Sequence, residues 1–236
     1  MKLSVIIPVY NEANTVERLI DRVALVPVDK EIIVVDDCST DGTREQLKKI
    51  ERKYPNIQVF YSSPNRGKGH AIKIGFKLAK GDIVLVQDAD MEYDPADYPN
   101  ILAPYAQGKA LAVYGSRFLG ECRNMIFPQF FANKFFNFLT NIIHGSRLTD
   151  TCTCYKSFRS DIIKSLPLEC DGFEICHEIN ARLLKGGCGI VEVPIRYFAR
   201  RSSEGKKVKW KVFFTSTYTI LKYGLAQCPA ARMDNA

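Results

Sequence analysis

The sequence lacks any stretch of about 18 uncharged apolar residues, the length that a membrane-spanning helix needs. The nearest candidate, residues 212–228, is interrupted by Lys222 and by several serines and threonines. The apolar run at the amino terminus is short and breaks at Pro8, so it predicts a strand rather than a secretory signal. We therefore expect a cytoplasmic protein that does not span a membrane.

Other absences point to an ordinary folded enzyme or binding domain. Proline is infrequent, and no repeat or low-complexity tract interrupts the chain, so we expect a single domain with disorder only at its ends. The eight cysteines have no regular spacing, and Cys152 and Cys154 form the only close pair. Without further ligands at a suitable spacing, free thiols in a reducing cytoplasm are favoured over zinc or disulfides.

Acidic residues are the minority, and the basic excess is concentrated late in the chain. The formal net charge is +7, from 33 lysines and arginines against 26 acids. Between residues 196 and 211 a single acid, Glu204, accompanies the following basic residues: Arg196, Arg200, Arg201, Lys206, Lys207, Lys209 and Lys211. Such a cluster indicates an anionic partner, and nucleic acid, an anionic membrane or a phosphate-bearing substrate would all fit.

The first 115 residues alternate between buried apolar runs and amphipathic segments. The runs that predict strands are residues 3–9, 31–35, 57–61, 82–87 and 111–114. Helical spacing lies between them, and residues 14–17 have the pattern of a capping box at the first helix start. This alternation predicts an α/β fold with a mostly parallel, Rossmann-like sheet flanked by helices.

Polar clusters follow the first four predicted strands of this half. They are Tyr10 with Glu12, Asp36 with Asp37, residues 65–69, and Asp88 with Asp90. Because ligands of parallel α/β sheets bind outside the carboxyl ends of the strands, we expect these clusters to meet at one edge.

The triplet Asp88-Ala89-Asp90 is the strongest candidate for chemistry. Alone, two aspartates one residue apart are often a solvated turn, but these directly follow a buried strand, residues 83–86. Two carboxylates fixed there can hold Mg²⁺ or Mn²⁺, which prefer oxygen ligands and suit diphosphates. The metal would neutralise a leaving nucleoside diphosphate.

Four ordered motifs resemble those of the inverting glycosyltransferases of family 2, which have the GT-A fold. The motifs are residues 5–12, 34–43, 65–69 and 88–90. The resemblance implies a nucleotide-sugar site with a metal at Asp88 and Asp90, and these residues around the donor: Pro8, Tyr10, Glu12, Val35, Asp37, Lys68, Asp88, Ala89, Asp90, Glu92 and Arg117.

The second half is similar to the branch with dolichyl-phosphate mannose synthases and polyprenyl-phosphate glucosyltransferases. The similar segments are residues 115–117, 150–151, 155–159, 172–178 and 191–195. In that branch an arginine and, six positions later, a lysine follow the last strand, which here implies Arg201 and Lys207. With Arg117 they would hold the acceptor phosphate, so the implied catalytic set is Asp90, Arg117, Arg201 and Lys207. A phosphate monoester is already an anionic nucleophile, so positioning and charge neutralisation can suffice.

The resemblance leaves the sugar and donor open. Glu92 stands where mannose synthases commonly carry glutamine, and residues 152–154 depart from the usual stretch, while residues 65–69 are more similar to the glucosyltransferases. We expect a hexosyltransferase that uses a GDP- or UDP-sugar, with mannose favoured and glucose or N-acetylglucosamine possible. A soluble glycan or polysaccharide acceptor is the alternative within the family.

Two amphipathic helices are expected in the second half, over residues 127–144 and 210–223. The first has apolar residues on one stripe and asparagines opposite; it would either pack its apolar stripe on the core or rest it on a bilayer. The expected organisation is a GT-A domain over residues 1–200, with a nucleotide-sugar half (1–117) and an acceptor half (118–200), then a basic segment and helix over 201–236.

Rival functions explain less of the sequence. A sugar-phosphate nucleotidyltransferase needs a basic, glycine-rich loop after the first strand, where this chain has residues 10–12. A non-enzymatic basic protein that binds membrane or nucleic acid explains the charge but not the carboxylates. We expect no nucleic acid partner, and peripheral binding to the cytoplasmic face of an anionic membrane.

Overall fold

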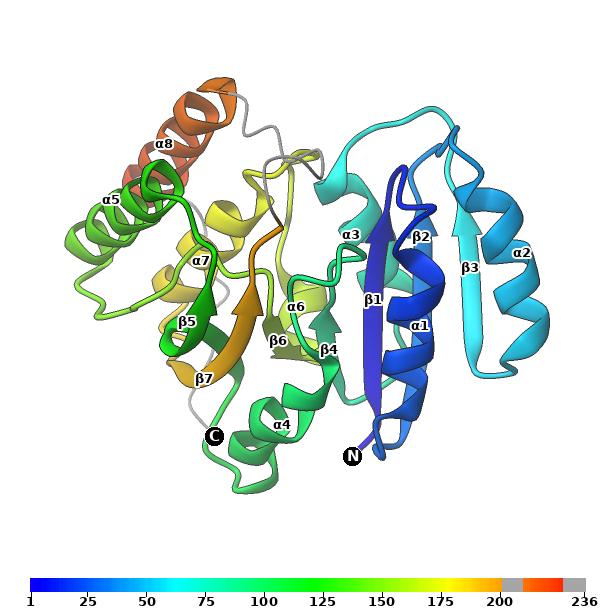
Figure 1. Cartoon of the computed structure of the whole chain (residues 1–236). Coiled ribbons are helices and arrows are strands. Elements are labelled where there is room, and N and C mark those ends of the chain that lie inside the picture. The colour runs from blue at the N-terminus through cyan, green and yellow to red at the C-terminus, as the bar shows by residue number, and fades with distance from the viewer. Residues whose placement is uncertain (201–209, 227–236) are drawn as a thin grey trace.

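Seven strands form one sheet, in the order β3-β2-β1-β4-β6-β5-β7 (Figure 1). The computed structural model describes residues 1–200 and 210–226. The strands are β1 (Leu3–Val9), β2 (Lys30–Asp36), β3 (Ile57–Tyr61), β4 (Ile83–Val86), β5 (Ala112–Arg123), β6 (Lys156–Arg159) and β7 (Ile190–Phe198). Only β6 runs against its neighbours, between β4 and β5. The predicted α/β fold with a mostly parallel sheet is confirmed.

Helices cover both faces of the sheet. They are α1 (Val16–Leu25), α2 (Thr43–Lys53), α3 (Lys68–Leu78), α4 (Tyr98–Ala106), α5 (Phe127–His144), α6 (Ser160–Ser165), α7 (Ile175–Lys185) and α8 (Trp210–Leu225), with a short 3-10 turn, η1, over Pro95–Asp97. One face carries α1, α2 and α4, and the other carries α3, α6 and α7 (Figure 1). The helices α5 and α8 pack on each other and on α7.

The strict alternation of side chains along β1 and β2 produces two cores. Val5 and Ile7 pack with α1 and α2 on one face, while Ile6 packs with α3 on the other. Ile33 and Val35 of β2 share that second core. Strands buried on both faces have near-continuous apolar sequences, which is why their positions could be predicted from the sequence.

Most expected elements are present, with differences in the second half. The strand expected over 111–114 continues as β5 to Arg123, so the expected boundary at residue 117 falls inside one strand of a shared sheet. The elements β6, α6 and α7 were not predicted. The capping box expected over residues 14–17 is absent: Thr15 is the N-cap of α1, but its hydroxyl donates to Glu12 Oε2 at 2.6 Å instead of bonding the helix backbone.

The orientation of α5 corrects one of the two expectations for this helix. Its buried side chains include Asn133, Asn137 and Thr140, whereas Phe131 and Phe138 are 65% and 63% exposed. The apolar stripe therefore faces outward and does not pack on the core. Asn137 packs inward because its amide bonds the backbone of the loop over residues 146–151, whereas the amide of Asn133 donates to Met125 Sδ at 3.7 Å.

Asn137 makes the central contacts to this loop. Its Nδ2 donates to the carbonyl of Thr149, and its Oδ1 accepts from the backbone N–H of Thr151 at 2.8 Å and from the Thr151 hydroxyl at 2.7 Å. A second asparagine, Asn141, bonds both the N–H and the carbonyl of Leu148. The polar face of α5 thus positions the loop that follows it.

We predict that Asn137→Leu lowers the free energy of unfolding by about 2 kcal/mol or more, because it leaves buried backbone groups of the loop without partners. Urea unfolding of the wild type and the variant measures the difference. Phe138→Ser on the outer face of the same helix is the control, with an expected change within about 0.5 kcal/mol. An unchanged or raised stability of Asn137→Leu would contradict the assigned role of the amide.

Candidate active site

A cavity of about 700 Å³ lies at the carboxyl ends of the central strands. Its wall is shared by the end of β4, the start of α3, β5, and the helices α5, α7 and α8. The volume suits a small-molecule ligand, and the lining combines apolar side chains with a few charged ones, as binding sites commonly do. The charged residues of its lining are Lys68, Asp88, Asp90, Glu92, Arg117, Lys156 and Arg200.

The carboxylates of Asp88 and Asp90 both lie beside basic side chains. Lys68 Nζ is 2.6 Å from Asp88 Oδ1, and Arg200 Nη2 is 3.5 Å from Asp90 Oδ2. Burial by itself would raise the pKa of Asp88, but the charge of Lys68, hydrogen bonds from Cys154 and Lys68, and the charge of Arg200 together leave the pKa below its usual value. Burial likewise disfavours the charged Lys68, yet Asp88 leaves the pKa of Lys68 above its usual value. Both groups of this pair are charged at neutral pH.

The loop before α3 delivers Lys68 to this place. Asp37, which is buried, accepts hydrogen bonds from the backbone N–H groups of Arg66 and Gly67. Gly67 has a φ of +105°, and a Cβ there would lie 2.6 Å from the carbonyl oxygen of Asp171. Only glycine fits this combination of conformation and close packing, so the loop is fixed from both sides.

Glu12 connects the end of β1 to Arg200. Its Oε2 accepts from the Thr15 hydroxyl, and its Oε1 accepts from Arg200 Nη2 at 2.7 Å. Tyr10 at the same strand end is half exposed. Arg200 therefore lies between two acids, Glu12 and Asp90, that the sequence separates by 78 positions.

Glu92 fixes the backbone from which Arg200 projects. It is 4% exposed, and its two oxygens accept from the Tyr197 hydroxyl at 2.6 Å and from the backbone N–H of Arg200 at 2.9 Å. The buried carboxylate thereby ties the end of β7 to the turn that follows Asp90.

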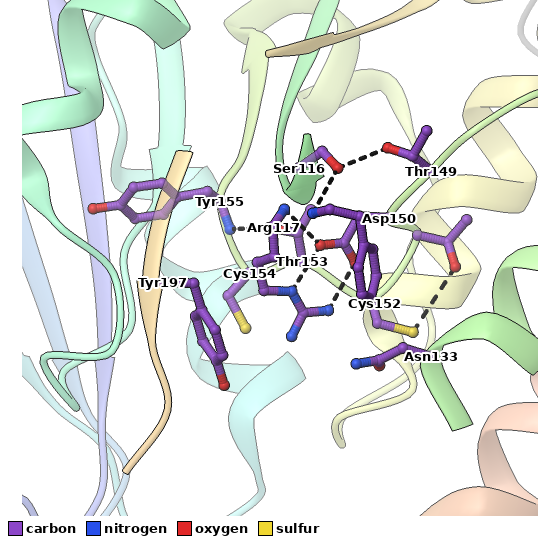
Figure 2. Close-up of polar contacts among 12 residues, drawn as sticks. Ser116, Arg117, Asn133, Thr149, Asp150, Cys152, Thr153, Cys154, Tyr155 and Tyr197 are labelled. Atoms are coloured by element: carbon purple, nitrogen blue, oxygen red, sulfur yellow. Dashed lines mark hydrogen bonds and ion pairs between the residues drawn. The ribbon is translucent and has the colours of Figure 1, made fainter. Parts of the chain in front are cut away.

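Arg117 forms a buried ion pair with Asp150 in the wall of the cavity (Figure 2). Its Nε and Nη2 donate to the two carboxylate oxygens, each at 2.7 Å, and its backbone N–H donates to the same carboxylate at 3.0 Å. The guanidinium also lies 5.1 Å from the centre of the Tyr197 ring. This bidentate pairing holds the guanidinium in one orientation.

The stretch over residues 152–154 lies beside this pair. Burial raises the pKa of Cys154 to about 12, and it raises the pKa of Cys152 even further, so both thiols are protonated at neutral pH. Lys68 Nζ donates to Cys154 Sγ at 3.2 Å, which brings the stretch into contact with the Lys68–Asp88 pair. In the part of the chain that the structure describes, no three side chains of His, Cys, Asp or Glu converge as a metal site.

Comparison with known proteins identifies the family. Residues 4–166 match glycosyl transferase family 2, over more than half of the chain. The chain belongs to glycosyltransferase family 2.

Three curated relatives of this glycosyltransferase are similar over most of its length. A dolichol-phosphate mannosyltransferase of Pyrococcus furiosus is 34% identical over 94% of the chain, which spans 64% of that relative. An undecaprenyl-phosphate mannosyltransferase of Micrococcus luteus is 28% identical, covering 96% of the chain and 95% of the relative. A polyprenol monophosphomannose synthase of Mycolicibacterium smegmatis is 30% identical, covering 98% and 89%.

Solved structures support the fold of the glycosyltransferase. Glucosyl-3-phosphoglycerate synthase of Mycobacterium tuberculosis, crystallised with Mn²⁺, UDP and glucosyl-3-phosphoglycerate, has a TM-score of 0.74 at 20% identity. The match covers 97% of this chain and 81% of that one. The GT-A fold expected from the sequence is confirmed.

The structure places the predicted site residues of the glycosyltransferase in different settings. Five of them line the cavity: Lys68, Asp88, Asp90, Glu92 and Arg117. Four lie at or beyond the ends of β1 and β2: Pro8, Tyr10, Glu12 and Asp37. The side chains of Val35 and Ala89 are buried in the two cores. Arg201 and Lys207 lie outside the described residues, and the binding roles of the whole set stay predictions.

Three residues with basic side chains line the cavity but were not among the predicted site residues. Arg200 was counted only as one of the late basic residues, because its acidic partners come from distant segments. Lys156 and His177, each 3% exposed, line the inner wall. Lys156 Nζ donates to the Thr151 carbonyl at 2.9 Å, and His177 Nδ1 has no hydrogen-bond partner among the described residues. Both lie in segments that resemble the polyprenyl-phosphate branch, but because β6 and α7 were not predicted, that resemblance did not place their side chains at the cavity.

The buried His177 predicts a specific dependence of stability on pH. Burial, reinforced by the charge of Lys156, lowers the pKa of His177 to about 3, while an unfolded histidine titrates near 6.5. Below pH 6.5 the unfolded state binds a proton that the folded state does not. The stabilisation by neutral His177 is complete above that pH and is lost as the pH falls toward 3.

Between pH 7 and pH 5 the wild type should lose about 2 kcal/mol more of its free energy of unfolding than His177→Gln does. Urea unfolding at both pH values measures this difference, and taking the variant as reference removes the contribution of all other titrating groups. An equal pH dependence in the two proteins would show that His177 protonates in the folded state.

Proposed function

We propose that the chain is an inverting glycosyltransferase that moves a hexose, with mannose favoured, from a GDP- or UDP-sugar to a polyprenyl phosphate. The observation that carries the proposal is the position of Asp88 and Asp90. They follow the end of β4 and line a cavity whose wall also contains Arg117 and Arg200. The names of the three relatives, which concern mannose and polyprenyl acceptors, support the same sugar and acceptor class.

The two carboxylates suit a divalent cation whose remaining ligands come from the donor. Each now lies against a side-chain cation, which a metal bound together with the donor phosphates would replace. With phosphate oxygens as the remaining ligands, Asp88 and Asp90 would hold Mg²⁺ or Mn²⁺, which would neutralise the leaving diphosphate. Pro8, Tyr10, Glu12 and Asp37 would surround the nucleotide. The crystal structure of the mycobacterial enzyme with Mn²⁺ and UDP supports a divalent metal bound together with a nucleoside diphosphate.

The acceptor phosphate would lie at the basic side of the cavity. Arg117 is held by Asp150 in the cavity wall, and Arg201 with Lys207 would complete the group. The phosphate oxygen of a polyprenyl phosphate is the nucleophile and carries no proton to remove, so this chain would act by holding the two anions in line. The apolar lining from α5 and α8, including Phe136 and Val212, would contact the lipid next to its phosphate.

An anionic membrane surface is the proposed location, on its cytoplasmic face. The helices α5 and α8 pack on each other through a stacked pair, Phe135 and Phe213, and both carry exposed apolar side chains, here called the aromatic surface. Its exposed members are Phe127, Phe130, Phe131, Phe138, Ile142, Phe214, Tyr218, Leu221 and Leu225. Such an apolar face beside basic residues is typical of interfacial helices. No helix within residues 1–200 or 210–226 is long and apolar enough to cross a bilayer.

We predict that Asp88→Asn or Asp90→Asn lowers metal-dependent transfer to a polyprenyl phosphate at least about 100-fold, because the leaving diphosphate loses its charge stabilisation. Transfer is measured with labelled GDP-mannose and UDP-glucose in the presence of Mn²⁺. Asp82→Asn is the matched control, since Asp82 precedes the opposite end of β4 and is exposed.

Full sugar transfer by either variant, Asp88→Asn or Asp90→Asn, in the presence of EDTA would contradict the metal-dependent mechanism. Equal transfer to a water-soluble glycan would refute the lipid acceptor. If no nucleotide sugar were used, and binding to anionic lipid or DNA survived Asp90→Asn, the non-enzymatic alternative would replace the proposal.

We also predict that the double variant Phe131→Ser/Phe138→Ser binds vesicles containing anionic lipid at least about tenfold more weakly, because two apolar side chains no longer leave water. Co-sedimentation with vesicles measures the binding. Leu25→Ser, an exposed apolar residue at the end of α1, is the control. Unchanged binding of the double variant would show that this surface does not contact the membrane.

A further inference from the structure

The two carboxylates proposed for the metal each have a basic partner that belongs to the chain itself. Lys68 pairs with Asp88 at 2.6 Å, and Arg200 approaches Asp90 at 3.5 Å while it bonds Glu12 at 2.7 Å. All of these side chains are largely buried: Lys68 and Asp88 are 17% and 14% exposed, and Arg200 and Asp90 are 24% and 22% exposed. Charges so removed from water interact more strongly than surface pairs do.

The backbones of both basic residues are held by contacts that do not depend on their side-chain ends. Lys68 is the first residue of α3, and the preceding loop is held by Asp37 and by the close packing of Gly67. The backbone of Arg200 is held by Glu92. Their long side chains can therefore turn to a new partner without any movement of the sheet or of the loop.

A metal ion that arrived alone would have to take the carboxylates from these two cations and then remain beside them. It would bring two positive charges next to those of Lys68 and Arg200, and only the carboxylates of Asp88, Asp90 and Glu12 would compensate these four charges. A nucleoside diphosphate changes this balance, because its phosphate oxygens ligate the metal and also offer charge-assisted hydrogen bonds to the displaced ammonium and guanidinium groups.

We propose that Lys68 and Arg200 act as internal counter-cations of Asp88 and Asp90, so that the metal binds tightly only together with the nucleoside diphosphate. The inference rests on the proposed function, which supplies the metal and the donor. Lys68 and Arg200 are positioning residues in this scheme: they hold the carboxylates in place before the donor arrives and its phosphates afterwards. Metal and nucleotide then strengthen each other's binding, and the coupling is the same in both directions.

The test is the affinity for Mn²⁺ alone, followed by electron paramagnetic resonance of free Mn²⁺ at constant ionic strength. Without nucleotide, Lys68→Met should bind Mn²⁺ at least about fivefold more tightly than the wild type, because Asp88 has lost its competing cation. Lys68→Arg retains the charge and should keep the wild-type affinity. Lys73→Met is the matched control: Lys73 lies on the same helix but pairs with Asp171.

The second arm adds GDP or UDP at a fixed concentration. A free diphosphate also chelates Mn²⁺. The Mn²⁺ binding of each protein with nucleotide is therefore compared with the Mn²⁺ binding of the same nucleotide without protein, and the gain is the difference between the two. This gain should be larger for the wild type than for Lys68→Met, and Lys73→Met should match the wild type. Circular dichroism and thermal melts confirm that each variant is folded.

Unchanged or weaker binding of Mn²⁺ alone by a folded Lys68→Met would overturn the inference. If the wild type still transferred sugar with Mn²⁺, only the counter-cation role would fail and the proposed function would stand. If no variant bound Mn²⁺ either with or without GDP or UDP, the metal-dependent function would fail together with the inference.

Discussion

The buried ion pair between Arg117 and Asp150 joins the parts of the molecule that make the cavity. Arg117 belongs to β5, and Asp150 to the loop that the asparagines of α5 hold from the other side. Removing one partner from such a pair typically costs about 3–5 kcal/mol, because the other charge stays buried and uncompensated. The pair thus ties the sheet to the outer helices, and it sets the course of residues 152–154, which contact the Lys68–Asp88 pair.

The first half of the fold could be predicted because its strands are buried on both faces. Short apolar runs such as Ile83–Val86, alternating with helical patterns, indicate buried parallel strands, and the polar residues that follow such strands lie at the carboxyl edge of the sheet. The second half gave weaker signals. The strand β6 has four residues, two of which are Lys156 and Arg159, so its sequence does not distinguish it from a loop. The helix α5 has a clear period, but periodicity alone does not say which face is inside.

The candidate site was predictable to a similar extent. Asp88, Asp90, Lys68 and Arg117 come together in one cavity, as the motifs indicated. Asp37 and Glu92 were expected to touch the donor, and in the structure their carboxylates bond backbone N–H groups that position Lys68 and Arg200. A motif identifies that a carboxylate is needed but not whether it acts on a ligand or on the chain. Arg200 could not be found in this way, since its partners come together only in the folded protein.

The two faces of α5 contact different surroundings. Its inner asparagines carry the loop that contains Asp150, and its outer phenylalanines project away from the protein. Because α5 is one helix of 18 residues, a change in the tilt of this helix would also move the loop that is bonded to its inner face. The setting of Arg117 is therefore mechanically linked to whatever the outer face rests on, and a support for that face would also steady the geometry of the cavity.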